Sequence, residues 1–145
     1  MGEPVIRLYV RGEPIPQPRP RVVTISGRAR AISAPSKHPV NDWKKRIMVA
    51  LATQFDGEIL DGPIHLDVTF LMPRPKRLMR KKDPQGEVWH TTRPDADNLI
   101  KAVKDACTGV LWKDDSQVCE LIVRKRYHAK DGHPAATVEV RCLSD

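Results

Sequence analysis

The alternation of apolar and polar residues between Ile64 and Phe70 constrains the fold of this chain more than any other feature. Side chains along a β-strand point alternately to opposite faces, so apolar residues at every second position give the strand one apolar face. The pattern therefore predicts a half-buried strand that continues to Met72 and needs other elements to cover its apolar side. The apolar series is Ile64, Leu66, Val68 and Phe70, and the polar series is His65, Asp67 and Thr69.

Two segments have the apolar spacing of helices that cover such a face. The first spans residues 41–55, and Asn41 is its expected N-cap. The second runs from about Asn98 to Thr108, and Gly109 is expected to end it. The apolar stripe of the first consists of Trp43, Ile47, Ala50, Leu51 and Phe55, and that of the second is centred on Leu99, Val103, Ala106 and Val110.

Shorter segments complete the predicted fold. Residues 5–10, 116–127 and 136–143 have strand composition, and residues 22–32 have the pattern of a hairpin with Gly27 in its turn. Residues 12–20 contain four prolines, which exclude a helix and predict an extended loop. The order of elements predicts one α+β domain over residues 1–145, with two main helices packed on a mixed sheet.

The charge of the chain points to a polyanionic partner. Its 145 residues include 25 Lys and Arg against 18 Asp and Glu, a formal net charge of +7. Six basic residues fall within positions 73–82, and residues 74–87 are expected to form a mobile loop. The alternative is a solvated surface with no ligand. The residues expected to contact DNA phosphates are Arg74, Lys76, Arg77, Arg80, Lys81 and Lys82, with Arg19 and Arg21 as a second group.

Location and redox state are constrained by what the sequence lacks. There is no run of about 18 consecutive apolar residues, and the first ten residues have no apolar stretch of signal-peptide length. The three cysteines form no CxxC pair, which is typical of free thiols in a reducing compartment. A cytoplasmic protein with no membrane span is therefore expected.

An acidic motif stands out against this basic background. Asp95 and Asp97 are separated by one residue, Lys101 follows one helical turn later, and Asp115 precedes the next strand. Carboxylates are the ligands that Mg²⁺ prefers, and an ammonium group can stabilise phosphoryl charge. Asp115 can return to the start of the helix only if the connecting chain crosses the sheet. Helix capping, an ordinary helix ion pair and turn chemistry are the alternative explanations.

The motif resembles the RusA family of Holliday junction resolvases. The matching residues are 93–106, which read RPDADNLIKAVKDA, and 109–118, which read GVLWKDDSQV. Residues near the N-terminus (Gly12, Pro14, Arg19, Pro20, Arg21) also resemble the family. The resemblance implies a homodimeric, Mg²⁺-dependent endonuclease, in which Mn²⁺ is expected to substitute, that nicks four-way DNA junctions symmetrically. It implies Asp95, Asp97 and Asp115 as metal ligands and catalytic residues, with Lys101 as the essential lysine.

Two other functions remain open from the residues alone. The first alternative to a junction resolvase is a basic DNA-binding protein whose aspartates only cap a helix. The second is a nuclease that prefers flaps or forks to four-way junctions. Trp89 and Trp112 are expected to be packing residues, although each could stack on unpaired bases. His90 is expected to be structural.

Overall fold

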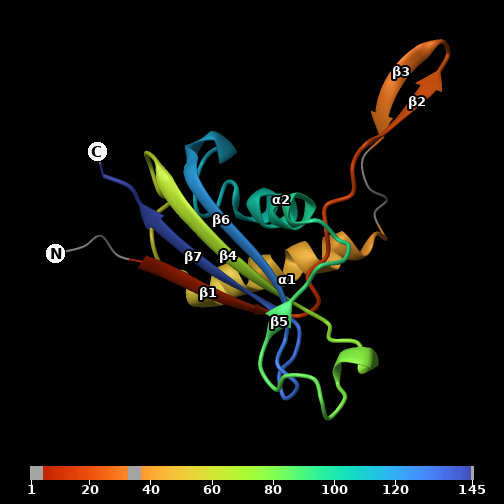
Figure 1. The fold of residues 1–145 in the computed structure, drawn as a ribbon. Helices are drawn as coiled ribbons and strands as arrows, with labels where there is room; N and C mark the ends of the chain where they lie inside the picture. The colour runs from red at the N-terminus through yellow and green to blue at the C-terminus, as the bar shows by residue number, and fades with distance from the viewer. Residues whose placement is uncertain (1–4, 33–36, 145) are drawn as a thin grey trace.

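Five strands form one mixed sheet in this structure, a computed structural model that describes residues 5–32 and 37–144 (Figure 1). The sheet order is β1-β7-β4-β6-β5; β4 and β6 run parallel, and the other neighbours are antiparallel. The α+β class and the mixed sheet are confirmed. The strands are β1 (Val5–Arg11), β4 (Ile64–Met72), β5 (Val88–Trp89), β6 (Val118–Tyr127) and β7 (Ala135–Cys142).

The central strand β4 has the buried face that its alternation predicts. Its four apolar side chains, from Ile64 to Phe70, have no exposed surface. Burial of a side chain the size of Phe70 contributes about 1.5–3 kcal/mol. His65 on the opposite face is buried as well, because it pairs with Glu120 of the parallel neighbour β6. The prediction that β4 is buried on one face only is therefore wrong at His65.

The helices α1 (Pro39–Gln54) and α2 (Ala96–Cys107) cover one face of the sheet. The first helix begins before Asn41, which lies inside it, so the predicted N-cap is wrong. Pro39 has no N–H to satisfy, and the side chain of His38 accepts a hydrogen bond from the Val40 backbone at 3.0 Å. The apolar stripes within both helices are buried, as predicted, whereas Phe55 and Val110 lie beyond the helix ends and are half-buried.

The two tryptophans differ in their surroundings. Trp112 is fully buried with Trp43 and Phe70 in the core, so its packing role is confirmed. Trp89 is 59% exposed, and the Arg126 guanidinium lies 4.2 Å from its ring centroid. The expectation that Trp89 packs in the core is wrong, because β5 is only two residues long and lies at the sheet edge.

The predicted hairpin is present as a separate two-stranded sheet, β2 (Arg21–Ile25) and β3 (Arg28–Ile32). Its turn consists of Ser26 and Gly27, whose φ angles are 52° and 75°. Two successive positive φ angles are typical of a tight type I′ turn, which matches the twist of the paired strands. The hairpin projects away from the body of the molecule (Figure 1), and we call it the arm.

Among the described residues, no helix is long and apolar enough to cross a membrane.

Candidate active site and nucleic-acid interface

The acidic pair, Asp95 and Asp97, lies at the start of α2. Asp95 is the N-cap and Asp97 falls in the first turn, so the helix begins two residues before the predicted Asn98. The Asp95 carboxylate makes no capping hydrogen bond, although capping was the alternative explanation for an aspartate here. Both side chains are exposed, at the end of the helix where the backbone dipole favours negative groups.

The proline-rich segment forms a wall beside this pair. The Gln17 backbone N–H donates to the Asn98 carbonyl at 2.9 Å, and Arg19 forms a 4.0 Å ion pair with Asp97. The extended loop predicted for residues 12–20 is confirmed, and it lies against the first turn of α2. The cavity between them has a volume of about 650 Å³ and is lined by Pro16, Gln17, Pro18, Arg19, Arg93, Pro94, Asp95 and Asn98.

The oxygen atoms at this cavity suit a hard divalent cation. The Asp95 carboxylate lines the cavity, and the Gln17 side-chain oxygen is buried with no hydrogen-bond partner among the described residues. Mg²⁺ prefers oxygen ligands and is often held by one or two carboxylates together with substrate phosphates. The carboxylates of Asp95 and Asp97 therefore have the chemistry that such an ion requires, and sequence reasoning did not identify the buried oxygen of Gln17.

Lys125 fixes the chain that leads into the acidic pair. Its ammonium group donates to the carbonyls of Thr92 and Pro94, at 2.8 and 2.7 Å. The sequence reasoning did not identify Lys125, although one signal was present. In β6 it lies two residues from Val123 and two from the buried Tyr127, so its side chain is on the helix-covered face. A lysine at such a position needs a polar partner.

Lys101 lies on α2 one turn beyond Asp97, and it is exposed. Residues four apart on a helix share a face, so its ammonium group projects from the same side as the Asp97 carboxylate. This arrangement agrees with the expected placement. The ammonium group of Lys101 is therefore a solvent-exposed cation on the same helix as the acidic pair.

Asp115 lies at the other end of α2. Its Oδ1 accepts hydrogen bonds from the Thr108 hydroxyl at 2.5 Å and from the Trp112 indole at 3.2 Å, and Thr108 is the C-cap of the helix. A helix of 12 residues is roughly 18 Å long, which separates Asp115 from the acidic pair. Among the described residues, no three His, Cys, Asp or Glu side chains form a group that could hold a metal. The three predicted ligands therefore do not meet within one chain, because a tight turn keeps Asp115 beside the helix end.

The neighbouring Asp114 has a structural role. Its side chain accepts from the Ser116 backbone at 2.8 Å and caps the short 3₁₀ helix η2 (Asp115–Gln117). Hydrogen bonds from Ser116 lower the pKa of the Asp114 carboxyl. The Gln117 side chain accepts from the Asp114 backbone at 3.0 Å and completes a capping box.

The expectation that Arg74 contacts DNA phosphates is wrong, because its side chain is buried. It is only 8% exposed, and its guanidinium donates to four backbone carbonyls. These contacts give the segment around it a defined path, whereas the mobility expected of residues 74–87 stays a prediction. The acceptors are the carbonyls of Leu78, Pro84, Gly86 and His128, at 2.8, 2.6, 2.7 and 3.3 Å.

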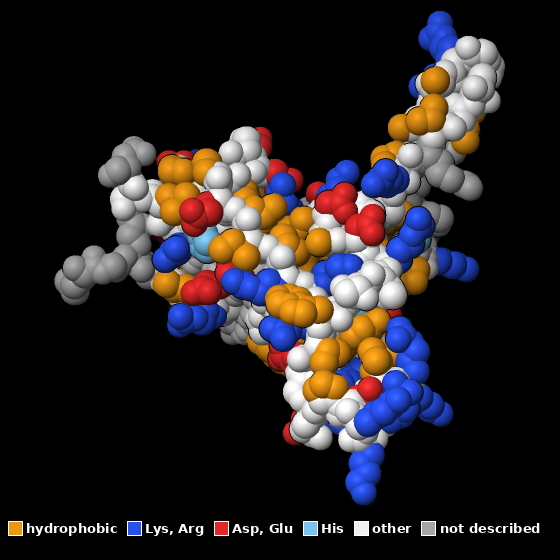
Figure 2. Space-filling view, viewed as in Figure 1, with side chains coloured by type: hydrophobic (Ala, Val, Ile, Leu, Met, Phe, Trp, Pro, Cys, Tyr) orange, Lys and Arg blue, Asp and Glu red, His pale blue; other side chains and the backbone are white. Residues whose placement is uncertain are grey.

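The other predicted basic residues of this loop are exposed. Arg80 forms an ion pair with Asp83 at 3.2 Å, and its hydrogen bond lowers the pKa of that carboxyl. Figure 2 shows Lys and Arg side chains gathered over this loop and around the root of the arm, with acidic side chains between them. The exposed set is Lys76, Arg77, Arg80, Lys81, Lys82 and Arg19, whereas the side chain of Arg21 lies outside the described set.

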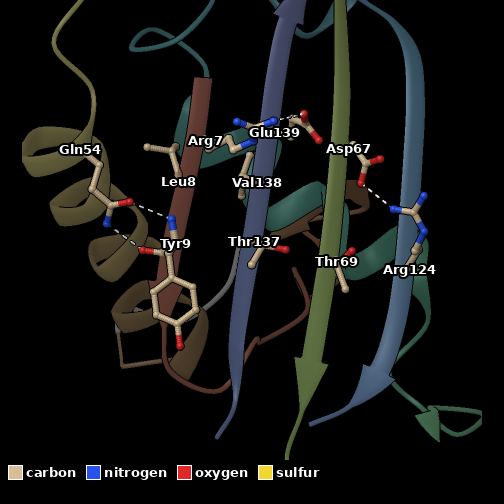
Figure 3. Close-up of a pocket in the computed structure, with 10 residues that line it drawn as sticks. All are labelled: Arg7, Leu8, Tyr9, Gln54, Asp67, Thr69, Arg124, Thr137, Val138 and Glu139. Carbon is tan, nitrogen blue, oxygen red and sulfur yellow. Dashed lines mark hydrogen bonds and ion pairs between the residues drawn. The ribbon is translucent and has the colours of Figure 1, made fainter. Parts of the chain in front are cut away.

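A second cavity lies on the open face of the sheet, opposite the helices (Figure 3). It has a volume of about 590 Å³. Its charged side chains form two internal ion pairs, Arg7 with Glu139 at 3.5 Å and Arg124 with Asp67 at 2.8 Å. A surface whose charges are already paired offers a polyanion no net attraction. The start of α2 is therefore the better candidate for a nucleic-acid site.

Comparison with known proteins identifies the family of the chain. The family model of endodeoxyribonuclease RusA matches residues 11–141, which include the proline-rich wall, the acidic pair and Asp115. The chain belongs to the RusA family. It is also 35% identical to the uncharacterized protein YqaN of Bacillus subtilis (strain 168), over 96% of this chain and 97% of that protein.

RusA proteins are endodeoxyribonucleases, hydrolases that resolve Holliday junctions, and the chain is an enzyme of this class. The family acts on branched DNA and depends on a divalent metal. Metal-dependent cleavage of DNA requires oxygen ligands for the ion and cations for the phosphates, and the acidic pair lies within a basic surface.

Proposed function

We propose that this chain is a Mg²⁺-dependent resolvase that nicks four-way DNA junctions symmetrically during recombination and repair. The proposal depends on one observation. The Asp95 carboxylate makes no capping hydrogen bond, and it is exposed together with Asp97 at a helix start within a basic surface. In a protein that only binds DNA, two exposed carboxylates at this position would repel the phosphates that the surrounding cations attract.

The residues of the site divide the work of phosphodiester hydrolysis. Asp95 and Asp97 would hold the divalent ion, which would supply an activated water molecule and offset charge on the phosphoryl oxygens. Lys101 donates hydrogen bonds to the charge that develops on the transferred phosphoryl group. Arg19, whose guanidinium lies 4.0 Å from the Asp97 carboxylate, would bind a phosphate oxygen of the DNA. Lys125 keeps the segment before Asp95 in place through its two carbonyl contacts.

A two-fold homodimer gives Asp115 a part in the same chemistry. Within one chain this residue lies at the far end of α2, so it reaches an acidic pair only if that pair belongs to the partner subunit. Its two hydrogen bonds end on Oδ1, so Oδ2 is the atom that a ligand would use. A two-fold dimer also presents two equivalent sites, which matches the two strands cut in a symmetric junction.

A cleavage assay tests the proposed function. Labelled four-way junction, flap, fork and linear duplex are incubated with Mg²⁺ and the wild type, Asp97→Asn or Asp105→Asn. Asp105 is an exposed aspartate further along the same helix, so it controls for the loss of one charge. We expect paired nicks in the junction that disappear only with Asp97→Asn. Preferred cleavage of flaps or forks would contradict the substrate assignment, and tight binding without cleavage would leave a DNA-binding protein.

A further inference from the structure

The arm and its flanks are the most one-sidedly charged part of the chain. Residues 14–37 contain five basic residues (Arg19, Arg21, Arg28, Arg30, Lys37) and no Asp or Glu. The whole chain, in contrast, has 18 acidic residues against 25 basic ones. Neither the five-stranded sheet nor the acidic pair explains why residues 14–37 carry only positive charges. This bias indicates that the arm meets a negatively charged partner.

One face of the arm combines arginine with the exposed Ile25 and the half-buried Val23. Cross-strand partners share a face, and the register pairs Ile25 with Arg28 and Val23 with Arg30. Ile25 is 53% exposed, and Val22 on the opposite face is 71% exposed. A two-stranded ribbon is marginally stable on its own, so a surface of this kind gains stability by docking.

The root of the arm is part of the candidate active site. Residues 16–19 line the cavity at Asp95, and Arg19 contacts Asp97. Prolines at positions 16, 18 and 20 restrict this connection, so the direction in which the arm leaves the body is constrained. A ligand held along the arm is therefore led to the acidic pair.

We propose that the arm is a DNA-binding ribbon. It enters a groove of the DNA duplex that flanks the phosphodiester to be cut. The inference rests on the proposed function and adds Arg28 and Arg30 to its DNA contacts. The major groove of B-DNA admits a two-stranded β-ribbon. The two guanidinium groups bind backbone phosphates, and Val23 and Ile25 face the floor of the groove.

DNA fits this face better than a second copy of the chain does. A protein partner that covered Val23 and Ile25 would also have to desolvate the arginine paired with each of them, which is unfavourable for every ion left without a partner. Phosphates pair with the same guanidinium groups and release counterions. The arrangement of one arginine beside each apolar residue thus favours the polyanion.

Salt dependence of binding tests the proposal. Fluorescence anisotropy measures the affinity of the full-length protein for a labelled junction, in EDTA and at about 50–200 mM salt. Each lost phosphate contact lowers the slope of log affinity against log salt by about 0.9, so Arg28→Gln/Arg30→Gln should lower it by about 1.8. The control Arg7→Gln/Arg141→Gln removes equal charge from exposed positions on the open face of the sheet and should leave the slope unchanged.

Equal slopes for the two double variants would overturn the arm proposal. An unchanged slope combined with dissociation of the arm variant in sedimentation would overturn it as well, and would assign the arm to a second copy. The proposed function fails separately. A wild type that binds with an arm-dependent slope but cuts no DNA in Mg²⁺ would refute the nuclease and leave the DNA-binding ribbon.

Discussion

Replacement of Arg74 by Met should destabilise the fold without removing a DNA contact. The side chain lies in the middle of a basic run, where sequence alone assigns it to phosphate binding. In the folded chain its guanidinium is surrounded by carbonyl oxygens at 2.6 to 3.3 Å. Methionine fills a similar volume but donates no hydrogen bond, so the variant isolates the loss of these contacts.

The expected loss of stability follows from those four acceptors. A hydrogen bond from a charged group contributes about 1.5–3 kcal/mol, and bonds to one guanidinium are not additive. Pro84 and Gly86 are exposed residues, so water can reach their carbonyls after the substitution, which limits the cost. We therefore expect a loss of about 2–4 kcal/mol in the free energy of unfolding. In a domain of this size that lowers the Tm by roughly 10 °C.

Urea denaturation and junction binding together test this reasoning. The control Lys76→Met removes an exposed charge two residues away and should leave stability within about 0.5 kcal/mol of the wild type. Measured below its Tm, Arg74→Met should bind the junction with the wild-type salt slope. An Arg74→Met variant of wild-type stability whose salt slope falls by about 0.9 would refute the argument, because Arg74 would then be a phosphate contact.

Three further predictions follow from exposure and pKa. Lys81→Gln/Lys82→Gln should lower the salt slope of junction binding by about 1.8 in anisotropy titrations, with no change in urea midpoint. Burial and the nearby charge of Lys125 lower the pKa of His90, so below its ordinary value of 6.5 the unfolded chain takes up a proton that the folded chain resists. Wild-type stability should therefore fall between about pH 7.5 and pH 5.5, and urea melts should show a smaller fall in His90→Gln. Burial raises the pKa of the Cys107 thiol to about 12, so brief iodoacetamide treatment followed by mass spectrometry should modify the exposed Cys119 and leave Cys107 intact.

Local patterns in the sequence were sufficient to predict most elements. The alternation up to Phe70 predicted β4, the spacing of Trp43 and Ile47 predicted α1, and Gly27 predicted the turn of the arm. Each of these signals depends on neighbours within one strand or one helical turn. The pairing of β4 with β6 and β7 depends on contacts far apart in the chain, so the strand order was not predictable.

The candidate site was only partly predictable for the same reason. Asp95, Asp97 and Lys101 lie at the N-cap and within the first two turns of α2, so their spacing in the sequence already places them near one another. Arg74 looked like a phosphate contact because its acceptors, from Leu78 to His128, come together only in the fold. The position of Asp115 depends on whether the chain after α2 crosses the sheet, and it turns tightly instead.

A mixture of two inactive variants tests the central claim most directly. Asp97→Asn and Asp115→Asn are each assayed on a labelled four-way junction in Mg²⁺, then mixed, unfolded and refolded together so that subunits exchange. If each site combines the acidic pair of one subunit with Asp115 of the partner subunit, a mixed dimer has one intact site and one doubly altered site. We predict that neither variant cuts alone and that the mixture nicks a single strand. Full activity of Asp115→Asn alone, or an inactive mixture in which mass spectrometry detects mixed dimers, would contradict the account.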